Sequence, residues 1–428
     1  MLDLNFIREN PERVRQGAAK KRISFDLDRL LALDVERRRL LTAREAAKAE
    51  QNRIGKQIAQ LSGTSKNEAL AASKALKDEV AVHELSLEPL QKAIDELLRH
   101  APNPPADDVP EGSTDADNVE VRRHGTPPVF DFPAKDHVDL MTARGWLDIE
   151  RAGRLGGSRS YILLGDAVLL EQAVLRLGLD LITARGFTPL SVPVLVKEAA
   201  LVGTAYFPGA EEQTYRIQNP TFEDQPAWLV GTSEVSVTAY RGGEVLDLGA
   251  LPLRYAGISP CFRREAGTYG KDTRGLYRVH QFQKVEQVVI DVADEARSRA
   301  HLEDIVKNAE DLLRALEVPY RVVTVCTGDM GRGQIKKYDL EAWMPGRKGY
   351  GETHSASMFG DFQARRLALR YRDAEGKVRH CHTLNNTVVA TPRALIAILE
   401  NHQRADGSIA IPKALRPYLG GREAFAAP

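Results

Sequence analysis

The chain has 428 residues, a length that suggests two or three domains and is ample for a hydrophobic core. Hydrophobic residues make up 43% and charged residues 28%, which excludes a wholly disordered chain. The 59 basic and 59 acidic side chains cancel, which argues against nonspecific coating of nucleic acid but allows a local basic patch.

The cysteines and the N-terminus bear on where the protein works. Cys261, Cys326 and Cys381 lie far apart and can form neither a disulfide framework nor a four-cysteine zinc site. We therefore expect no zinc and a reducing, cytoplasmic setting. The N-terminal sequence MLDLNFIRENPERV carries acids among its apolar residues, unlike a signal peptide. The most apolar helical stretch, residues 163–182, is interrupted by charged residues, so no membrane span is expected.

The first hundred residues predict a helical arm. Asn10 and Pro11 suit the N-cap and first turn of a short helix. Two apolar stripes follow, at Leu33, Leu40, Ala47, Ile54 and Leu61, and then at Leu76, Val80, His83, Leu87, Leu90, Ile94 and Leu97. A Gly/Ser turn separates them, so residues 28–100 predict an antiparallel coiled-coil hairpin with helices roughly 50 Å long. Pro89 is expected to kink the second helix or split it near Ser86.

Basic side chains gather on the first arm helix. They include Arg37, Arg38, Arg44, Lys48, Arg53 and Lys56. A solvated helix face is the ordinary explanation for such charges. Because so thin an arm cannot enclose a pocket, we favour contact with an RNA backbone.

A proline-rich linker predicts two domains, residues 1–110 and residues 111–428. In the second we expect a helix capped by Asp166 and ended by Gly186. The other expected elements are strands at 187–196, 285–290 and 320–325 and a helix at 293–316. Strands and helices do not alternate regularly, which favours an α+β fold with an antiparallel sheet flanked by helices.

The densest functional signal lies at residues 254–287. Two apolar runs flank a basic loop and predict a hairpin that holds Arg263 and Glu265 at one end. A guanidinium binds phosphate or carboxylate oxygens in pairs, and a carboxylate can accept from an amino group such as that of adenine. A surface hairpin with salt bridges is the alternative. Residues 267–273 resemble a phosphate-binding loop only vaguely, because their spacing is wrong.

A second signal is the pair Glu352 and Ser355, which precedes a strand-like stretch at 362–372. Carboxylate and hydroxyl oxygens are ligands that Mg²⁺ prefers. A capped turn would explain the same residues.

A third signal lies at residues 382–387, which lead into a predicted helix at 394–401. Arg393 stands at the start of that helix, where the dipole favours anions, although it could merely form a salt bridge. His380 and His382 would share one face of a strand. No further ligand lies near them in the sequence, so we predict no metal site there.

Together these segments resemble the bacterial-type seryl-tRNA synthetases, a family of class II aminoacyl-tRNA synthetases, nearly end to end. The resemblance is carried by GTSEV at 231–235, SPCFRREAG at 259–267, DTRGLYRVHQFQKVEQ at 272–287, CTGDM at 326–330, ETHS at 352–355 and DFQARR at 361–366. It implies a coiled-coil, tRNA-binding arm followed by a class II catalytic domain. It also implies a homodimer interface at residues 169–193.

The resemblance further implies the site residues. For ATP these are Arg263 at the α-phosphate, Glu265 at the adenine amino group, Val279 and Phe282 at the ring, Glu352 and Ser355 at Mg²⁺ and phosphate, and Arg393 at the far end of the triphosphate. For serine they are Thr232 and Glu234 at the ammonium, Glu286 and Thr387 at the hydroxyl, and Arg263 and Asn385 close by. Arg263, Glu352 and Arg393 would be catalytic. Ser233, Thr387 and Ala356 depart from common family residues, but no charged catalytic group is missing.

The implied activity is ATP-dependent activation of L-serine to seryl-adenylate, followed by transfer to tRNA(Ser). The arm would grip the long variable arm of that tRNA, which makes tRNA(Sec) a second expected substrate. One alternative is a paralogue that loads a carrier protein, which would lack the helical arm. Another is an inactive RNA-binding scaffold, which should have lost charges at the ATP site.

Overall fold

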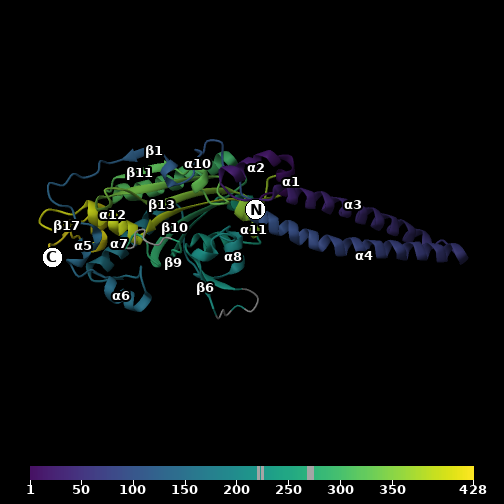
Figure 1. Cartoon of the computed structure of the whole chain (residues 1–428), viewed down its shortest axis with the longest axis horizontal. Coiled ribbons are helices and arrows are strands. Elements are labelled where there is room, and N and C mark those ends of the chain that lie inside the picture. The colour runs from purple at the N-terminus through teal and green to yellow at the C-terminus, as the bar shows by residue number, and fades with distance from the viewer. Residues whose placement is uncertain (219–221, 223–225, 268–273) are drawn as a thin grey trace. The chain divides into compact units, whose positions relative to one another are not determined.

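The computed structural model describes residues 1–218, 222, 226–267 and 274–428 (Figure 1). The loop at 267–273, whose resemblance to a phosphate-binding loop was rejected, lies outside the described residues except for Gly267. Contacts divide the chain into two compact units, residues 2–102 and residues 103–428 with Met1. Among the described residues, no helix combines the length and hydropathy that a membrane crossing requires.

The N-terminal unit is entirely helical. Its helices are α1 (Leu4–Glu9), α2 (Pro11–Lys20), α3 (Leu27–Ile58) and α4 (Gly63–His100). Helices α3 and α4 lie side by side and run antiparallel (Figure 1), and both predicted apolar stripes are buried or half-buried along their length. The hairpin arm is therefore confirmed.

Two local expectations for this unit need correction. Asn10 is the N-cap residue of α2, but its side chain does not cap the helix and instead donates to the carbonyl of Phe6 at 3.1 Å. Helix α4 is not split near Ser86, because it runs without a break through Pro89. Pro89 is exposed, so water can satisfy the backbone carbonyl that loses its helical partner.

The C-terminal unit contains an eight-stranded sheet in the order β1-β11-β12-β13-β16-β10-β9-β4. The strands are β1 (Val119–His124), β4 (Thr188–Ser191), β9 (Leu253–Phe262), β10 (Gln281–Asp291), β11 (Tyr320–Thr324), β12 (Lys336–Met344), β13 (Gly349–Gly360) and β16 (His382–Ala390). Every neighbouring pair is antiparallel except β4 and β9. Three helices share one hydrophobic core with the sheet: α7 (Asp166–Ala184), α10 (Glu295–Ala315) and α12 (Thr391–Asn401). The predicted α+β class is confirmed.

Shorter elements surround this sheet. The helices are α5 (His137–Thr142), α6 (Ile149–Gly156), α8 (Glu198–Gly203), α9 (Glu234–Ala239) and α11 (Phe362–Leu367). The strands pair as β2 (Leu147–Asp148) with β3 (Ile162–Leu163), and β17 (Ile409–Ala410) with β18 (Ala424–Phe425). Two three-stranded sheets are β5 (Leu195–Lys197), β7 (Ala227–Leu229) and β6 (Tyr215–Ile217), and β15 (Val378–His380), β14 (Arg370–Arg372) and β8 (Val245–Asp247).

Several predicted boundaries in this unit are wrong. Asp166 is the first residue of α7 rather than its cap, and it binds Arg422 at 2.7 Å. The strand expected at 187–196 is divided between two sheets, with β4 before Pro193 and β5 after it, and Pro193 has no N–H to donate to a ladder. The stretch 362–372 begins with helix α11 and only ends as strand β14.

The predicted histidine pair is also separated. His380 ends β15 and His382 begins β16, so they belong to different sheets and do not share a strand face. Nδ1 of His382 lies 2.8 Å from Oγ of Ser298, which gives it a structural partner.

Candidate active site

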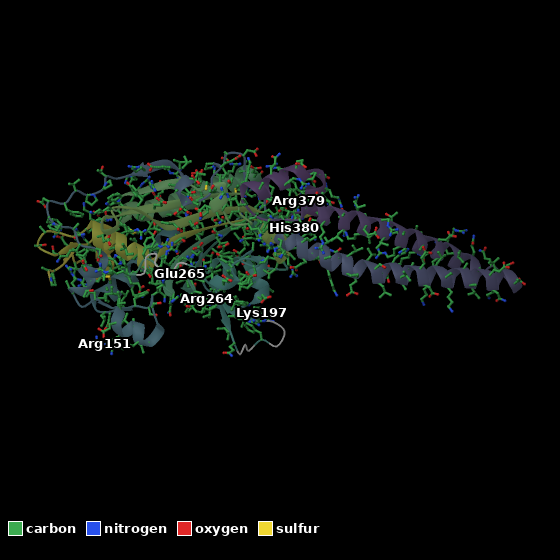
Figure 2. The ribbon with its side chains drawn as sticks, in the orientation of Figure 1. Arg151, Lys197, Arg264, Glu265, Arg379 and His380 are labelled. Atoms are coloured by element: carbon green, nitrogen blue, oxygen red, sulfur yellow. The ribbon has the colours of Figure 1, made fainter. Side chains whose placement is uncertain are left out.

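The hairpin of β9 and β10 holds the two residues predicted at its end. Its register places Phe262 opposite Gln281, so Arg263 and Glu265 follow β9 where the hairpin opens. Figure 2 labels Glu265 and its neighbour Arg264. Nε of Arg263 donates to the carbonyl of Gly231 at 3.2 Å, and the guanidinium lies 5.3 Å from the centre of the Phe282 ring. Its two Nη groups have no hydrogen-bond partner in the described part of the chain, so they are available to an anion.

One cavity brings together every residue predicted to bind ATP or serine. Those residues are Thr232, Glu234, Arg263, Glu265, Val279, Phe282, Glu286, Glu352, Ser355, Asn385, Thr387 and Arg393. The sequence did not predict the other lining residues, which are Tyr206, Tyr277, Lys284, Gln334, Thr353, Ser357, Ala390 and Pro392. The individual roles of the predicted residues stay predictions.

A β-bulge explains how Glu352 and Ser355 reach the same cavity. Three positions apart on a regular strand, they would point to opposite faces. In the pairing of β12 with β13, however, Glu341 lies opposite Glu352 and Leu340 opposite His354, which leaves Thr353 as an extra residue. The alternative of a capped turn is therefore wrong, since both residues lie inside strand β13.

A second bulge shapes the opposite wall. Glu286 pairs with Thr387 and Val285 with Val389, so Val388 is the extra residue of β16. The bulge lets Thr387 and Ala390, three positions apart, line the same cavity. It also sets Thr387 directly across from Glu286, whose Oε2 accepts from the threonine hydroxyl at 3.3 Å.

Arg393 and Glu352 form one end of the cavity. Arg393 donates from Nη1 to the carbonyl oxygen of Glu352 at 2.7 Å and lies 3.4 Å from its carboxylate, while its guanidinium stands 4.4 Å over the Tyr277 ring. Burial alone would raise the pKa of Glu352, but the charges of Arg393, Lys337 and Arg263 outweigh it and lower that pKa. The Glu352 carboxylate is therefore ionised at neutral pH.

The same end of the cavity fits a divalent cation that arrives with phosphates. Glu352 offers a carboxylate, Ser355 a hydroxyl, and Asp339 lies beside them across the strand pair. Burial raises the pKa of Asp339 to about 7, although Lys337 opposes the shift. No cluster of three or more His, Cys, Asp or Glu able to hold a metal by itself occurs in the described ranges. This donor set suits Mg²⁺, which is usually bound by one or two carboxylates together with substrate phosphates and water.

The other end of the cavity is buried and crowded with charges. Nζ of Lys284 lies 2.6 Å from Oγ1 of Thr232 and 2.5 Å from Oε2 of Glu286. Glu234 accepts from the Tyr206 hydroxyl at 2.7 Å and from Nε2 of Gln363 at 2.9 Å. Burial, reinforced by the nearby Glu286, raises the pKa of Glu234 to about 7.

Close packing between two backbone segments shapes the buried end of the cavity. The turn before α9 lies against β9 at Gly257, where a Cβ atom would come within 2.5 Å of Val237 and 2.8 Å of Oγ of Ser233. The Ser233 hydroxyl donates to the Gly257 carbonyl at 3.2 Å, so it turns away from the cavity. Among the residues that sequence reasoning missed, Lys284 had a signal, because it lies two positions from Glu286 on one strand face. Tyr206 had none, since it comes from a distant segment.

A buried histidine holds the segment that leads from the hairpin loop into β10. The backbone N–H of Leu276 donates to Nε2 of His137 at 3.1 Å, so the ring proton sits on Nδ1 and is donated to Glu400 at 2.8 Å. Glu400 also accepts from the N–H of Gly346 at 2.7 Å. Gly275 is required beside this contact, because it has φ +80° and its Cβ would collide with the His137 ring.

We expect His137→Ala to lower the free energy of unfolding by about 1–3 kcal/mol, because it leaves the Leu276 N–H buried without an acceptor. The urea unfolding midpoint measures this change. The exposed His124→Ala serves as the control and should leave the midpoint in place. Equal midpoints for both variants would contradict the role of the His137 contact.

The basic residues predicted to contact tRNA lie on α3 within the N-terminal unit. Arg37 and Arg38 bind the buried carboxylate of Asp34 at 3.0 and 3.2 Å. The others, Arg44, Lys48, Arg53 and Lys56, lie further along the helix, where Arg53 pairs with Glu50 and Arg44 with Glu45. Such exposed pairs are worth about 0–1 kcal/mol each, so a phosphate can replace the acid.

The class of protein follows from the antiparallel sheet together with the two bulged strands and the arginines Arg263 and Arg393 of the cavity. Residues 215–402 match the tRNA synthetase class II core domain (G, H, P, S and T), and residues 1–105 match the seryl-tRNA synthetase N-terminal domain. The fold is that of a class II aminoacyl-tRNA synthetase.

Relatives narrow the class to a family. The chain is 47% identical over 428 residues to the serine–tRNA ligase of Deinococcus radiodurans, covering all of both chains, and 43% identical to that of Symbiobacterium thermophilum, covering 98% of each. Among solved structures, the chain is similar to the crystal structure of seryl-tRNA synthetase from Pyrococcus horikoshii complexed with ATP. The match covers 100% of both chains, with a TM-score of 0.93 and 39% sequence identity. For the cytoplasmic serine–tRNA ligase from Naegleria fowleri in complex with AMP, the TM-score is 0.89 at 31% identity, and the match covers 100% of this chain and 99% of that one. The chain belongs to the seryl-tRNA synthetase family, as the sequence resemblance predicted.

Proposed function

We propose that the cavity activates L-serine with ATP and that the seryl group then passes to tRNA(Ser). The observation that carries this proposal is the joint placement of Arg263, Glu352 and Arg393 beside the buried pair of Glu286 and Thr387. A site for an anionic nucleotide and a site for a small hydroxyl compound thus share one wall. The relatives named above are serine–tRNA ligases, and two solved structures hold ATP or AMP.

The nucleotide end supports an assignment of ATP contacts. Arg263 binds the α-phosphate through its Nη groups, and Arg393 binds the far end of the triphosphate. Phe282 and Val279 are buried beside Cys261 and form an apolar wall for the adenine ring. Glu265 accepts from the adenine amino group.

The buried end supports the amino-acid contacts. Glu234 and Thr232 receive the serine ammonium, and the Glu286 carboxylate and the Thr387 hydroxyl receive the serine hydroxyl, with Asn385 next to them. Glu352 and Ser355 hold Mg²⁺ with the triphosphate, and the ion, when bound, neutralises phosphate charge. Such a polar site can discriminate by about 10⁴–10⁵ against an analogue without the hydroxyl, because Oε1 of Glu286 would then stay without a donor.

Catalysis in this proposal needs no side-chain nucleophile. The serine carboxylate attacks the α-phosphorus, the bond to the β-phosphate oxygen breaks, and pyrophosphate leaves. Arg263 aligns the carboxylate with the α-phosphate and stabilises the charge that develops on phosphorus. The terminal ribose hydroxyl of tRNA then attacks the acyl carbon, and AMP leaves.

The N-terminal unit supports the tRNA part of the proposal. We assign residues 1–110 to tRNA binding, with α3 and α4 holding the long variable arm of tRNA(Ser), and the same contact would admit tRNA(Sec). We also propose a homodimer through α7 and its surroundings, where Leu169, Leu164 and Leu155 are 52%, 40% and 84% exposed. An apolar surface of this kind is typical of a subunit interface.

Pyrophosphate exchange measured with each of the twenty amino acids tests the proposed function. Exchange that depends on serine and ATP is expected, with alanine, glycine and threonine far below it. Exchange with another amino acid, or none at all, would overturn the assignment. Absence of exchange would favour the inactive scaffold, although Arg263, Glu265, Glu352 and Arg393 are all present in the cavity.

We expect kcat/KM for serine to fall about tenfold per pH unit below pH 7, because the ammonium binds only ionised Glu234 and burial holds the pKa of that group at about 7. Above pH 7 the carboxylate is charged and the dependence should level. Pyrophosphate exchange at saturating ATP measures the profile. Glu234→Gln should weaken serine binding and remove this limb, whereas an unchanged limb in that variant would contradict the assignment.

A further inference from the structure

Lys284 is a buried cation that the proposed mechanism does not use. It lies on β10 and is 4% exposed, two positions before Glu286, which is 2% exposed. Its Nζ bridges Oγ1 of Thr232 at 2.6 Å and Oε2 of Glu286 at 2.5 Å. One lysine therefore contacts both the predicted ammonium-binding segment and the predicted hydroxyl acceptor.

The contacts of Glu286 are unequal at its two oxygens. Oε2 takes both Lys284 and the Thr387 hydroxyl. Oε1 has no hydrogen-bond partner among the residues that the structure describes, while the side chain lines the cavity. The lysine thus occupies one oxygen and leaves the other to a ligand.

Lys284 is the positive charge that lies nearest to the Glu286 carboxylate, as the groups around them show. Glu234 faces it from α9 and Arg263 from the end of β9. Burial keeps the Cys261 thiol on β9 neutral by raising its pKa, and burial lowers the pKa of His354 on β13 to about 4, so that ring is neutral too. Tyr206 is held uncharged, because burial and the neighbouring Glu234 raise its pKa. Without Lys284, two buried carboxylates would share one cavity, and one of them would take up a proton.

We propose that Lys284 is a positioning residue for hydroxyl selection: it holds Oε2 of Glu286 and turns Oε1 toward the amino acid as a hydrogen-bond acceptor. A ligand must then present a hydrogen-bond donor at that point. The serine hydroxyl does so, and the methyl group of alanine does not. This inference rests on the proposed function, because it concerns selection at the same site.

Lys284→Met tests the inference, since methionine keeps the length of the side chain and removes its charge. We expect the serine KM to rise about 100-fold and the preference for serine over alanine to fall by a similar factor, while the ATP KM stays within about threefold. Lys377→Met, at a lysine 69% exposed, is the control.

A double-mutant cycle separates positioning from a merely structural role. With Glu286→Gln already present, Lys284→Met should not lower the serine preference further, because the carboxylate that Lys284 positions is gone. An equal loss in both backgrounds would overturn the inference. So would a Lys284→Met enzyme with the parent serine preference.

A second variant and a measurement on the parent enzyme complete the test. If Lys284→Met does not fold, Lys284→Gln retains a polar group and should show the same fall in the preference for serine over alanine; a parent-like preference overturns the inference. Parent enzyme without serine-dependent exchange would defeat the proposed function itself, which is a different result from normal exchange that is insensitive to Lys284.

Discussion

Glu286→Ala should lower serine-dependent pyrophosphate exchange by at least about 10³-fold, while ATP still binds. The substitution removes the acceptor opposite Thr387 and leaves the serine hydroxyl without its partner in a site that excludes water. Buried polar sites of this kind discriminate by about 10⁴–10⁵ when one hydrogen-bond partner is missing. Initial rates of exchange at several serine concentrations, with ATP saturating, measure the loss.

Two further variants serve as controls for the Glu286→Ala result. Glu286→Gln keeps the side-chain volume but cannot carry the charge, so it should retain the fold and still lose most of the exchange. Glu244→Ala removes an exposed carboxylate of the same unit and should exchange at the parent rate. Near-normal exchange by a folded Glu286→Ala enzyme would refute the role of this carboxylate.

Most of the residues that line the cavity could be predicted from the resemblance to the seryl-tRNA synthetases, and the local sequence around the charged ones agrees with it. Arg263 and Glu265 follow directly on an apolar strand, and Arg393 stands within the first turn of an apolar helix. The end of an apolar strand and the start of a helix are local features, so the sequence predicts where these side chains emerge. Their convergence in one cavity follows from the order of the sheet.

The strand geometry that joins them could not be predicted. Period-two alternation places Glu352 and Ser355 on opposite faces, and only the extra residue Thr353 brings them to one face. A bulge has no sequence signature of its own, because it depends on the pairing register with a neighbouring strand. The same holds for Thr387 and the bulge at Val388.

The secondary-structure prediction was wrong at 362–372, where an interaction between polar side chains overrides the local apolar pattern. The apolar alternation after Asp361 predicted a strand, but Arg365 reaches back to that carboxylate at 2.8 Å with the four-residue spacing of a helix. Lys284 was missed for a related reason, since a lone lysine in a strand is usually a solvent-exposed residue. Its burial beside Glu286 is visible only when α9 is placed against the sheet.

In the arm, the apolar stripes predicted the hairpin because heptad spacing is a local, repeated signal. The polar support at its base could not be predicted in the same way. Asp34 occupies a buried position on α3, and its carboxylate binds Arg8 of α1 at 3.0 Å as well as Arg37 one turn further along α3. Burial would raise the pKa of Asp34, but these arginines lower it, so the carboxylate stays charged. Any test of the arm must leave this cluster intact.

Replacing residues 44–80 by the turn sequence Ala-Gln-Leu-Ser-Gly found at 59–63 should leave serine activation within about threefold and lower aminoacylation of tRNA(Ser) at least about 100-fold. The shortened arm retains the contacts of Asp34 and of Arg37 with Gln91, and it loses Arg44, Lys48, Arg53 and Lys56. Each charge-assisted contact with a phosphate is worth about 1.5–3 kcal/mol, so the loss of two contacts already accounts for that factor. Pyrophosphate exchange and tRNA charging, measured on one preparation, give the two rates.

A full-length variant distinguishes the effect of losing the basic charges from the effect of shortening the arm. Changing the same four basic residues to glutamine should weaken charging and flatten its decline with salt, because fewer counterions are released when fewer phosphates are bound. The shortened arm should show the same flattening, since it lacks the same charges. Equal loss of activation and charging in the shortened protein would show that the arm is not separable from the catalytic unit. Normal charging by both variants would place the tRNA contact elsewhere on the chain.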